Sequence, residues 1–129
     1  MSRNENAAKP RASQEAKLQA ECFKWFWNTY PEERRTFYHV QNKAKNKIEG
    51  NKFKAMGVVK GIAAMPWHTP SGKVCYFEFK TDTGGQFAEQ KEFEAKVKLR
   101  GGEYVIIRNL EEFKTKVNET LNEIKKNRV

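Results

Sequence analysis

The chain has 129 residues, of which 38% are hydrophobic and 32% charged, a balance typical of one soluble globular domain. Lys and Arg outnumber Asp and Glu by 25 to 16, and the resulting charge of +9 favours an acidic partner, foremost nucleic acid. No apolar run approaches the roughly 20 residues of a membrane span, and residues 1–11 contain no hydrophobic signal segment, which predicts a cytoplasmic protein. Two cysteines and two histidines are too few and too widely spaced for a disulfide framework or a zinc knuckle.

The N-terminal part is predicted to hold a tail and a helix. Residues 1–12 are polar and lack periodicity, so we expect a flexible tail followed by a single domain at residues 13–129. Apolar residues then recur at helical spacing, which predicts a helix over residues 13–30 with Ser13 as its N-cap. Pro31 ends this pattern.

The middle of the chain predicts short strands joined by a polar connector. Residues 36–40 are β-branched and aromatic enough for a strand, whereas residues 41–47 are too polar for a core element. Residues 62–65 are predicted to form a strand that Pro66 ends. A turn at residues 69–72 then leads into the next strand, so the two form a hairpin.

The C-terminal half predicts a strand over residues 74–80, a helix over residues 86–99 and a strand over residues 104–107. A last helix follows Asn109, whose side chain is expected to cap it with Glu112 three residues later. This order of elements predicts an α/β fold in which helices flank a mixed β-sheet.

The strand over residues 74–80 carries the most informative pair of side chains. Alternation puts Glu78 and Lys80 on one face and Phe77 and Phe79 on the other. A carboxylate that holds a divalent cation, beside an ammonium that orients water or offsets phosphate charge, suits phosphodiester hydrolysis. A solvated ion pair on an exposed sheet face is the alternative, and spacing alone favours this alternative.

Inward-facing polar residues on two predicted helices are further candidates. Glu15 and Gln19 lie on the apolar side of the first helix, where a carboxylate is costly unless a cation meets it. A metal site would provide that cation, while a position in the frayed first turn is the alternative explanation for Glu15. Gln90 lies on the apolar face of its helix and could hold a water or Lys80, or satisfy a backbone group.

A lysine-rich segment follows the predicted strand at residues 36–40. Such a cluster can neutralise several phosphates, although a solvated basic face is the simpler alternative. His39 at its start is either a DNA contact or proton shuttle, or a structural histidine. The lysines are Lys43, Lys45, Lys47, Lys52, Lys54 and Lys60.

Several short motifs occur in a specific order over about ninety residues. They are Glu15-Ala-Lys-Leu-Gln19, His39-Val-Gln-Asn42, the stretch from Gly50 through Gly57 and Gly61 to Ala64, Phe77-Glu78-Phe79-Lys80, Gly85-Gln-Phe-Ala-Glu-Gln90 and Gly102-Glu-Tyr104. Together they resemble the virus-type replication-repair nuclease (VRR-NUC) domains, a branch of the PD-(D/E)XK nuclease superfamily.

This resemblance implies a restriction-endonuclease-like fold, a mixed central β-sheet flanked by α-helices, and hydrolysis of DNA phosphodiesters with Mg²⁺ or Mn²⁺. The implied metal ligands are Glu78, the backbone carbonyl of Phe79 and Glu15. Lys80 would position the attacking water, and Gln90 would support it.

The sequence departs from the family pattern at one metal ligand. The family has Gly-Val-Pro-Asp where this chain has Gly61-Ile62-Ala63-Ala64, and alanine has no oxygen to bind a cation. An engineered inactivation and a natural pseudonuclease would both explain Ala64, and in either case we expect impaired catalysis.

Substrate and assembly follow from the same resemblance. Stand-alone members of the family resemble Holliday-junction resolvases, so the implied state is a homodimer acting on branched DNA, with Asn42 among the DNA contacts. A non-catalytic protein that binds branched DNA is the alternative.

Overall fold

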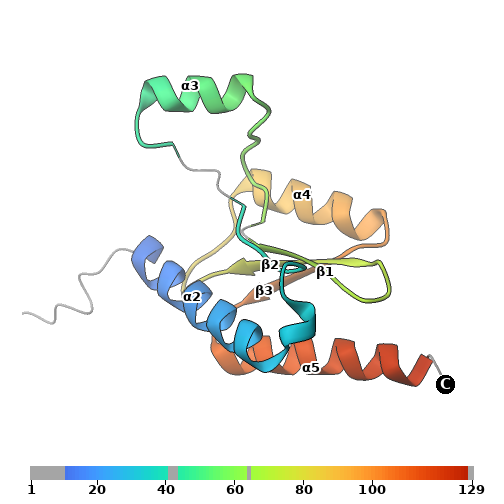
Figure 1. Ribbon diagram of the computed structural model, residues 1–129. Coiled ribbons are helices and arrows are strands. Elements are labelled where there is room, and N and C mark those ends of the chain that lie inside the picture. Colours follow the sequence, from blue (N-terminus) through green and yellow to red (C-terminus); the bar gives the residue numbers. More distant parts are fainter. Residues whose placement is uncertain (1–10, 41–43, 64, 128–129) are drawn as a thin grey trace, which may run out of the picture. The chain divides into compact units, whose positions relative to one another are not determined.

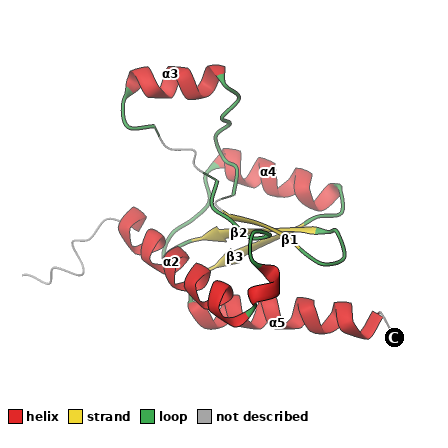
Figure 2. Ribbon diagram, viewed as in Figure 1, coloured by secondary structure: helices red, strands yellow, loops and turns green. Residues whose placement is uncertain are grey.

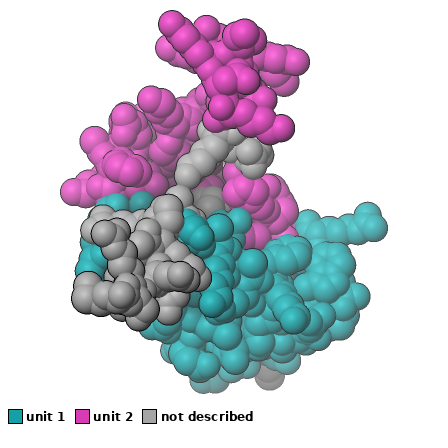
Figure 3. All heavy atoms as spheres, turned by 90° about the vertical axis from the view of Figure 1, so that its left-hand side faces the viewer, with its two compact units in different colours: residues 1–35, 79–85, 106–129 teal, residues 36–78, 86–105 magenta. Residues whose placement is uncertain are grey.

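The computed structural model of the chain describes residues 11–40, 44–63 and 65–127 (Figures 1 and 2). The chain comprises two compact units, coloured separately in Figure 3: unit 1 contains residues 1–35, 79–85 and 106–129, and unit 2 contains residues 36–78 and 86–105. No helix in the described ranges is long and apolar enough to cross a membrane.

Helices and strands alternate in the way that the sequence predicts for an α/β fold, and the strands form a three-stranded mixed sheet in the order β1-β2-β3. β1 pairs antiparallel with β2, from Met65 opposite Phe77 to His68 opposite Val74, so the predicted hairpin is present. The elements are α2 (Arg11–Thr29), the short 3₁₀ helix η1 (Pro31–Glu33), α3 (Lys47–Ala55), β1 (Met65–His68), β2 (Val74–Phe79), α4 (Ala88–Leu99), β3 (Glu103–Ile107) and α5 (Leu110–Asn127).

Unit 1 is built around the packing of α2 on α5. The helical stripe of α2 buries Cys22 and Phe26, and that of α5 buries Phe113 and Val117. Phe113 is the centre of this core, since the rings of Phe26 and, at the end of β2, Phe79 lie 6.4 and 6.2 Å from it. Burial of these large side chains is the main source of stability in unit 1.

Unit 2 has aromatic packing on both faces of β2. Phe77 stacks on Trp67 of β1 at 6.3 Å and meets the edge of Phe37 at 5.8 Å. Tyr76, the next residue back, packs edge-on against Phe93 of α4 at 5.0 Å. Strand alternation therefore operates as predicted, and the face that carries Tyr76 is the one on which α4 packs.

Two predicted strands differ from the structure. In residues 36–40 only Phe37 forms an isolated bridge, to Trp67, so no strand is present there. The strand predicted at residues 62–65 begins at Met65 and runs through Pro66. β1 is at an edge of the sheet's strand order, where the missing N–H of a proline is tolerated.

The helix ends give one confirmed cap and two corrections. Asn109 Oδ1 accepts the Glu112 N–H at 2.9 Å, as predicted for α5. Ser13 is not an N-cap, because α2 begins at Arg11. α3 was not predicted at all: Asn46 caps it by accepting the Glu49 N–H at 2.8 Å, a local signal that the polar composition obscured.

Candidate active site

Glu78 and Lys80, the two residues singled out on the third predicted strand, are both buried. Their side chains are 3% and 5% exposed, so the alternative of a solvated surface pair is wrong. An ionised group in such surroundings is unfavourable by several kcal/mol unless hydrogen bonds or an opposite charge compensate it. The partners of Glu78 therefore decide what its carboxylate can do.

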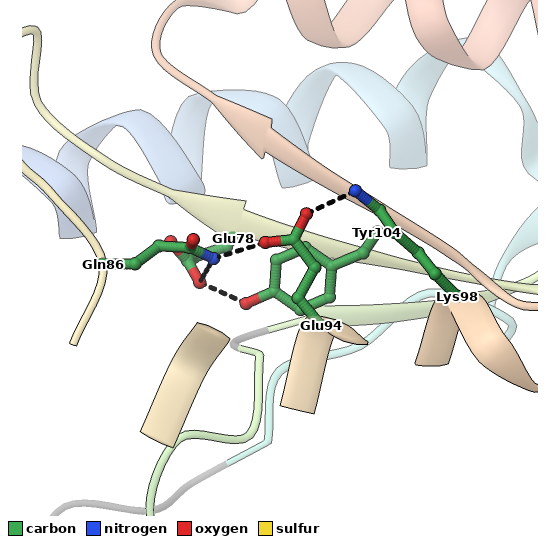
Figure 4. A network of polar contacts seen from close by, with 5 residues as sticks. All are labelled: Glu78, Gln86, Glu94, Lys98 and Tyr104. Carbon is green, nitrogen blue, oxygen red and sulfur yellow. Dashed lines mark hydrogen bonds and ion pairs between the residues drawn. The ribbon is translucent and has the colours of Figure 1, made fainter. Parts of the chain in front are cut away.

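Glu78 belongs to a hydrogen-bonded chain of five side chains within unit 2, which we call the carboxylate network (Figure 4). Its Oε1 accepts the Tyr104 hydroxyl and, at 3.3 Å, the Gln86 amide. The same Gln86 nitrogen donates to Glu94 Oε1 at 2.9 Å, and Lys98 donates to Glu94 Oε2 at 2.6 Å. Donors from β3 and from the loop before α4 thus meet at the Glu78 carboxylate of β2, and Gln86 links it to the Glu94–Lys98 pair of α4.

The network fixes the protonation of two of its members. Burial, reinforced by the Glu78 hydrogen bond and charge, raises the pKa of Tyr104, so its hydroxyl stays a donor at neutral pH. The hydrogen bond from Lys98, opposed by burial, leaves the pKa of Glu94 below its ordinary value. Glu94 is therefore anionic at neutral pH, and Lys98 offsets its charge.

The two oxygens of Glu78 differ. Oε1 accepts two donors, whereas Oε2 is buried and has no hydrogen-bond partner among the described residues. A buried carboxylate oxygen without a hydrogen bond is unfavourable, and binding a hard divalent cation would compensate its charge. Mg²⁺ is commonly held by one or two carboxylates together with water and substrate phosphates, so Glu78 fits such an ion. The described residues include no cluster of three His, Cys, Asp or Glu side chains that could hold a metal by themselves.

Lys80 belongs to unit 1, where it begins the segment after β2. Its backbone N–H donates to the Ile107 carbonyl at 3.0 Å, which extends the sheet pairing past Phe79. The turn that follows is held by Arg108, whose guanidinium donates to the carbonyl of Thr81 and, at 2.9 Å, to that of Gly84. The backbone at Lys80 is thus fixed on both sides.

Glu15 of α2 reaches the same turn within unit 1. A methyl group on Gly84 would lie 3.5 Å from Glu15 Oε1 and 3.0 Å from Thr81 Oγ1, so both oxygens converge on this glycine. Thr81 Oγ1 is itself buried without a partner among the described residues. α2 has no acidic residue in its first turn, so the first-turn explanation for half-buried Glu15 is wrong. Gln19, one turn further on, is also half-buried.

The remaining predicted site residues fall into three groups. Gln90 Oε1 accepts the Phe87 N–H at 2.8 Å, so this side chain satisfies a backbone group at the start of α4. His39 and the described lysines of the basic segment are exposed. Ala64, Asn42 and Lys43 lie outside the described residues.

Four of the five network residues have no site role in the sequence-based prediction. Tyr104 and Gln86 lie within the motifs of the family resemblance, but nothing in their spacing linked them to Glu78. Glu94 and Lys98 form an ordinary pair four residues apart on a helix, and only the fold brings Glu94 to Gln86.

Comparison with known proteins gives a result at the level of structure. No family model and no curated protein matches the sequence. A solved structure described as "VRR_NUC domain protein" matches with a TM-score of 0.64 and 16% sequence identity, covering 84% of this chain and 88% of that chain. The chain therefore has a VRR-NUC fold, as the sequence motifs implied.

Proposed function

We propose that this domain is a metal-dependent DNA endonuclease of the VRR-NUC type, acting on branched DNA such as four-way junctions, and that Ala64 impairs its catalysis. The observation that carries the proposal is the Glu78 carboxylate, which is buried within a nuclease-family fold with one oxygen held by two donors and the other bare. That arrangement suits a metal ligand better than a structural ion pair.

In this proposal the site residues have different catalytic roles. Glu78 binds Mg²⁺ or Mn²⁺ through Oε2, and the carbonyl of Phe79, the next residue in the chain, is a further ligand. A cation bound there would supply an activated water and offset charge on the phosphate. Lys80, two residues after Glu78, carries the ammonium that orients the nucleophile or stabilises the developing negative charge.

DNA binding rests on charge, and assembly on the symmetry of the substrate. The net charge of +9 and the exposed lysines favour a polyanion. Symmetric cleavage of two strands needs two equivalent sites, which a twofold homodimer supplies. A monomeric mass in light scattering at micromolar concentration would contradict the dimer.

The decisive experiment restores the missing ligand. Ala64→Asp should produce Mg²⁺- or Mn²⁺-dependent cleavage of labelled four-way junctions, flaps or nicked duplexes. The unmodified chain, which has Ala64, gives the baseline activity. Ala64→Asp combined with Glu78→Gln is the matched control and should be inactive. Absence of cleavage by the revertant across all substrates and both metals would overturn the catalytic proposal.

A second candidate function is a non-catalytic protein that binds branched DNA. It is favoured by Ala64 itself, whose side chain cannot hold a cation. It predicts junction binding that Glu78→Ala leaves unchanged and a revertant without activity. The same cleavage experiment therefore separates the two candidates.

A further inference from the structure

Helix α3 of unit 2 is stabilised only locally in the described structure (Figure 1). None of its nine residues is buried, and the hydrogen bonds that residues 44–60 make with described residues all close within that segment. Asn46 caps its start by accepting the Glu49 N–H at 2.8 Å, and Glu49 Oε1 accepts the Lys45 N–H at 3.2 Å. A helix this short is marginal in water by itself, so a binding partner would add much to its stability.

The surface of α3 combines exposed apolar and basic side chains. Ile48, Lys52 and Met56 follow one another at intervals of four residues and therefore form one stripe along the helix. Ile48 is 82% exposed and Met56 is 70% exposed, which is unusual for large apolar residues. Lys47 and Lys54 lie seven residues apart, on the neighbouring stripe.

Charge selects the kind of partner. The segment of residues 44–60 carries Lys45, Lys47, Lys52, Lys54 and Lys60 but a single acid, Glu49, which is engaged in the cap. A second copy of this segment would place like charges together, which is unfavourable. The positive charge of the segment attracts a polyanion such as DNA instead. The phosphates pair with the lysines but provide no contacts for the apolar side chains.

Exposed base faces complement those apolar side chains. In an intact duplex the bases are stacked, and separating a step requires a few kcal/mol. In a single-stranded gap base faces are already accessible, and at a junction or nick the interrupted duplex opens at a lower cost, so apolar contacts form more readily there. An element with lysines around apolar side chains therefore binds an interrupted duplex better than a continuous one.

We propose that α3 recognises DNA branch points and breaks, with its lysines on the flanking phosphates and Ile48 and Met56 against exposed base faces. This inference rests on the DNA binding in the proposed function and deepens it, because it names the element that selects interrupted DNA. It does not depend on cleavage.

The test measures binding by the full chain as written, using fluorescence anisotropy with a four-way junction, a nicked duplex and an intact duplex. Ile48→Ser with Met56→Ser should weaken binding to the junction and nick by about tenfold and leave the intact duplex within twofold. Lys52→Gln with Lys54→Gln should weaken binding to all three DNAs similarly. It should also reduce the slope of log affinity against log salt by the amount expected for about two lost phosphate contacts.

Leu99 of α4 provides a matched control, since it is 85% exposed and lies outside the segment, and Leu99→Ser should leave all affinities unchanged. Circular dichroism checks that each variant stays folded, which is expected because none of the replaced side chains is buried.

Three outcomes would overturn the inference. Equal loss on all three DNAs would make the apolar residues general contacts, and no loss on any DNA would leave them without a role in binding. Reduced mass in light scattering with unchanged DNA affinity would assign the stripe to a second copy of the chain. If the unmodified chain binds none of the three DNAs, both this inference and the DNA binding in the proposed function are wrong. Cleavage by Ala64→Asp tests the catalytic part of the proposed function separately.

Discussion

The carboxylate network and α3 are two regions of unit 2 that are organised in opposite ways. In the network, five side chains from three elements and a loop hold one another, and Glu78 at its centre is buried. In α3 no residue is buried, and the basic and apolar side chains point to solvent. Both are rich in polar groups, so what separates them is how far other parts of the fold constrain each side chain.

This contrast matches what the two proposed tasks require. A metal ligand must be held close to one geometry, which supporting hydrogen bonds provide. A surface that binds branched DNA of variable shape gains from side chains that can adapt. Substitutions around Glu78 should therefore change metal affinity, whereas those in α3 should change DNA affinity alone.

Glu78→Gln should produce the largest effect. It keeps the shape of the side chain but removes the charge, and a metal-bound carboxylate contributes several kcal/mol, so Mn²⁺ affinity should fall by about 100-fold or more. Titration calorimetry with Mn²⁺ on the revertant Ala64→Asp measures this change.

The free energy of unfolding in the same variant tests whether Glu78 is a ligand or a structural anchor. Replacing a buried charge by a neutral amide of equal size is often close to neutral for stability. A large loss of stability with unchanged Mn²⁺ affinity would assign Glu78 to the scaffold.

Tyr104→Phe should have the next largest effect, because it removes a donor to Glu78 Oε1 without changing the ring. Loss of a residue that orients a metal ligand typically weakens metal binding by about 10- to 100-fold. Mn²⁺ titration of the revertant measures this loss. Tyr76→Phe, which removes a hydroxyl outside the network, is the matched control and should leave Mn²⁺ affinity unchanged.

Tyr104 also makes a pH-dependent contribution to stability. Its pKa is raised in the folded state, so the protonated hydroxyl contributes stability that is fully present below its ordinary value near 10. That contribution is lost as pH rises above this value towards the folded pKa. Urea unfolding between pH 8 and 11 should therefore show a decline that Tyr104→Phe reduces, and an identical decline in the variant would contradict this assignment.

The regular elements of the fold could be predicted because their causes are local. Alternation on β2, the stripe of α5 and the Asn109 cap depend on residues a few positions apart. α3 was missed because its residues are too polar for an apolar pattern, although Asn46 and Glu49 carry a capping signal. Residues 36–40 have strand propensity but only one bridge, since pairing depends on the neighbouring chain.

The site was less predictable, because its causes are not local. Whether Glu78 is solvated depends on what covers its face of the sheet, and the sequence of β2 does not contain that information. Its partner Tyr104 comes 26 residues later in the chain, and no spacing rule connects the two. The family motifs single out Glu78, whereas the network that holds it required the structure.

Arg108→Met should have a smaller effect, and in unit 1 rather than in the network. The guanidinium donates to the carbonyls of Thr81 and Gly84, and hydrogen bonds from a charged group contribute about 1.5–3 kcal/mol to stability. We expect a loss near the lower figure in urea unfolding. Arg108→Lys, which can reach only one carbonyl at a time, should lose less, and equal losses would show that packing rather than the clamp matters.

Lys98→Met should have the smallest effect, because its partner Glu94 lies four residues away on the same helix and Lys98 is largely exposed. Pairs of this kind contribute about 0.2–0.5 kcal/mol. The pKa of Glu94 is lowered, so this contribution is present above its ordinary value and is lost as pH falls through the folded pKa. Unfolding should therefore show a larger difference between variant and parent at pH 7 than at pH 3.

Lys96→Met is the matched control for that last change, since its partner Glu92 is also four residues away but both side chains face solvent, at 3.5 Å. It should change stability less than Lys98→Met, because Glu94 also accepts the Gln86 amide and is therefore more tightly held. If the two lysines gave equal effects, Glu94 would behave as an ordinary surface carboxylate, and the network that supports Glu78 would end at Gln86.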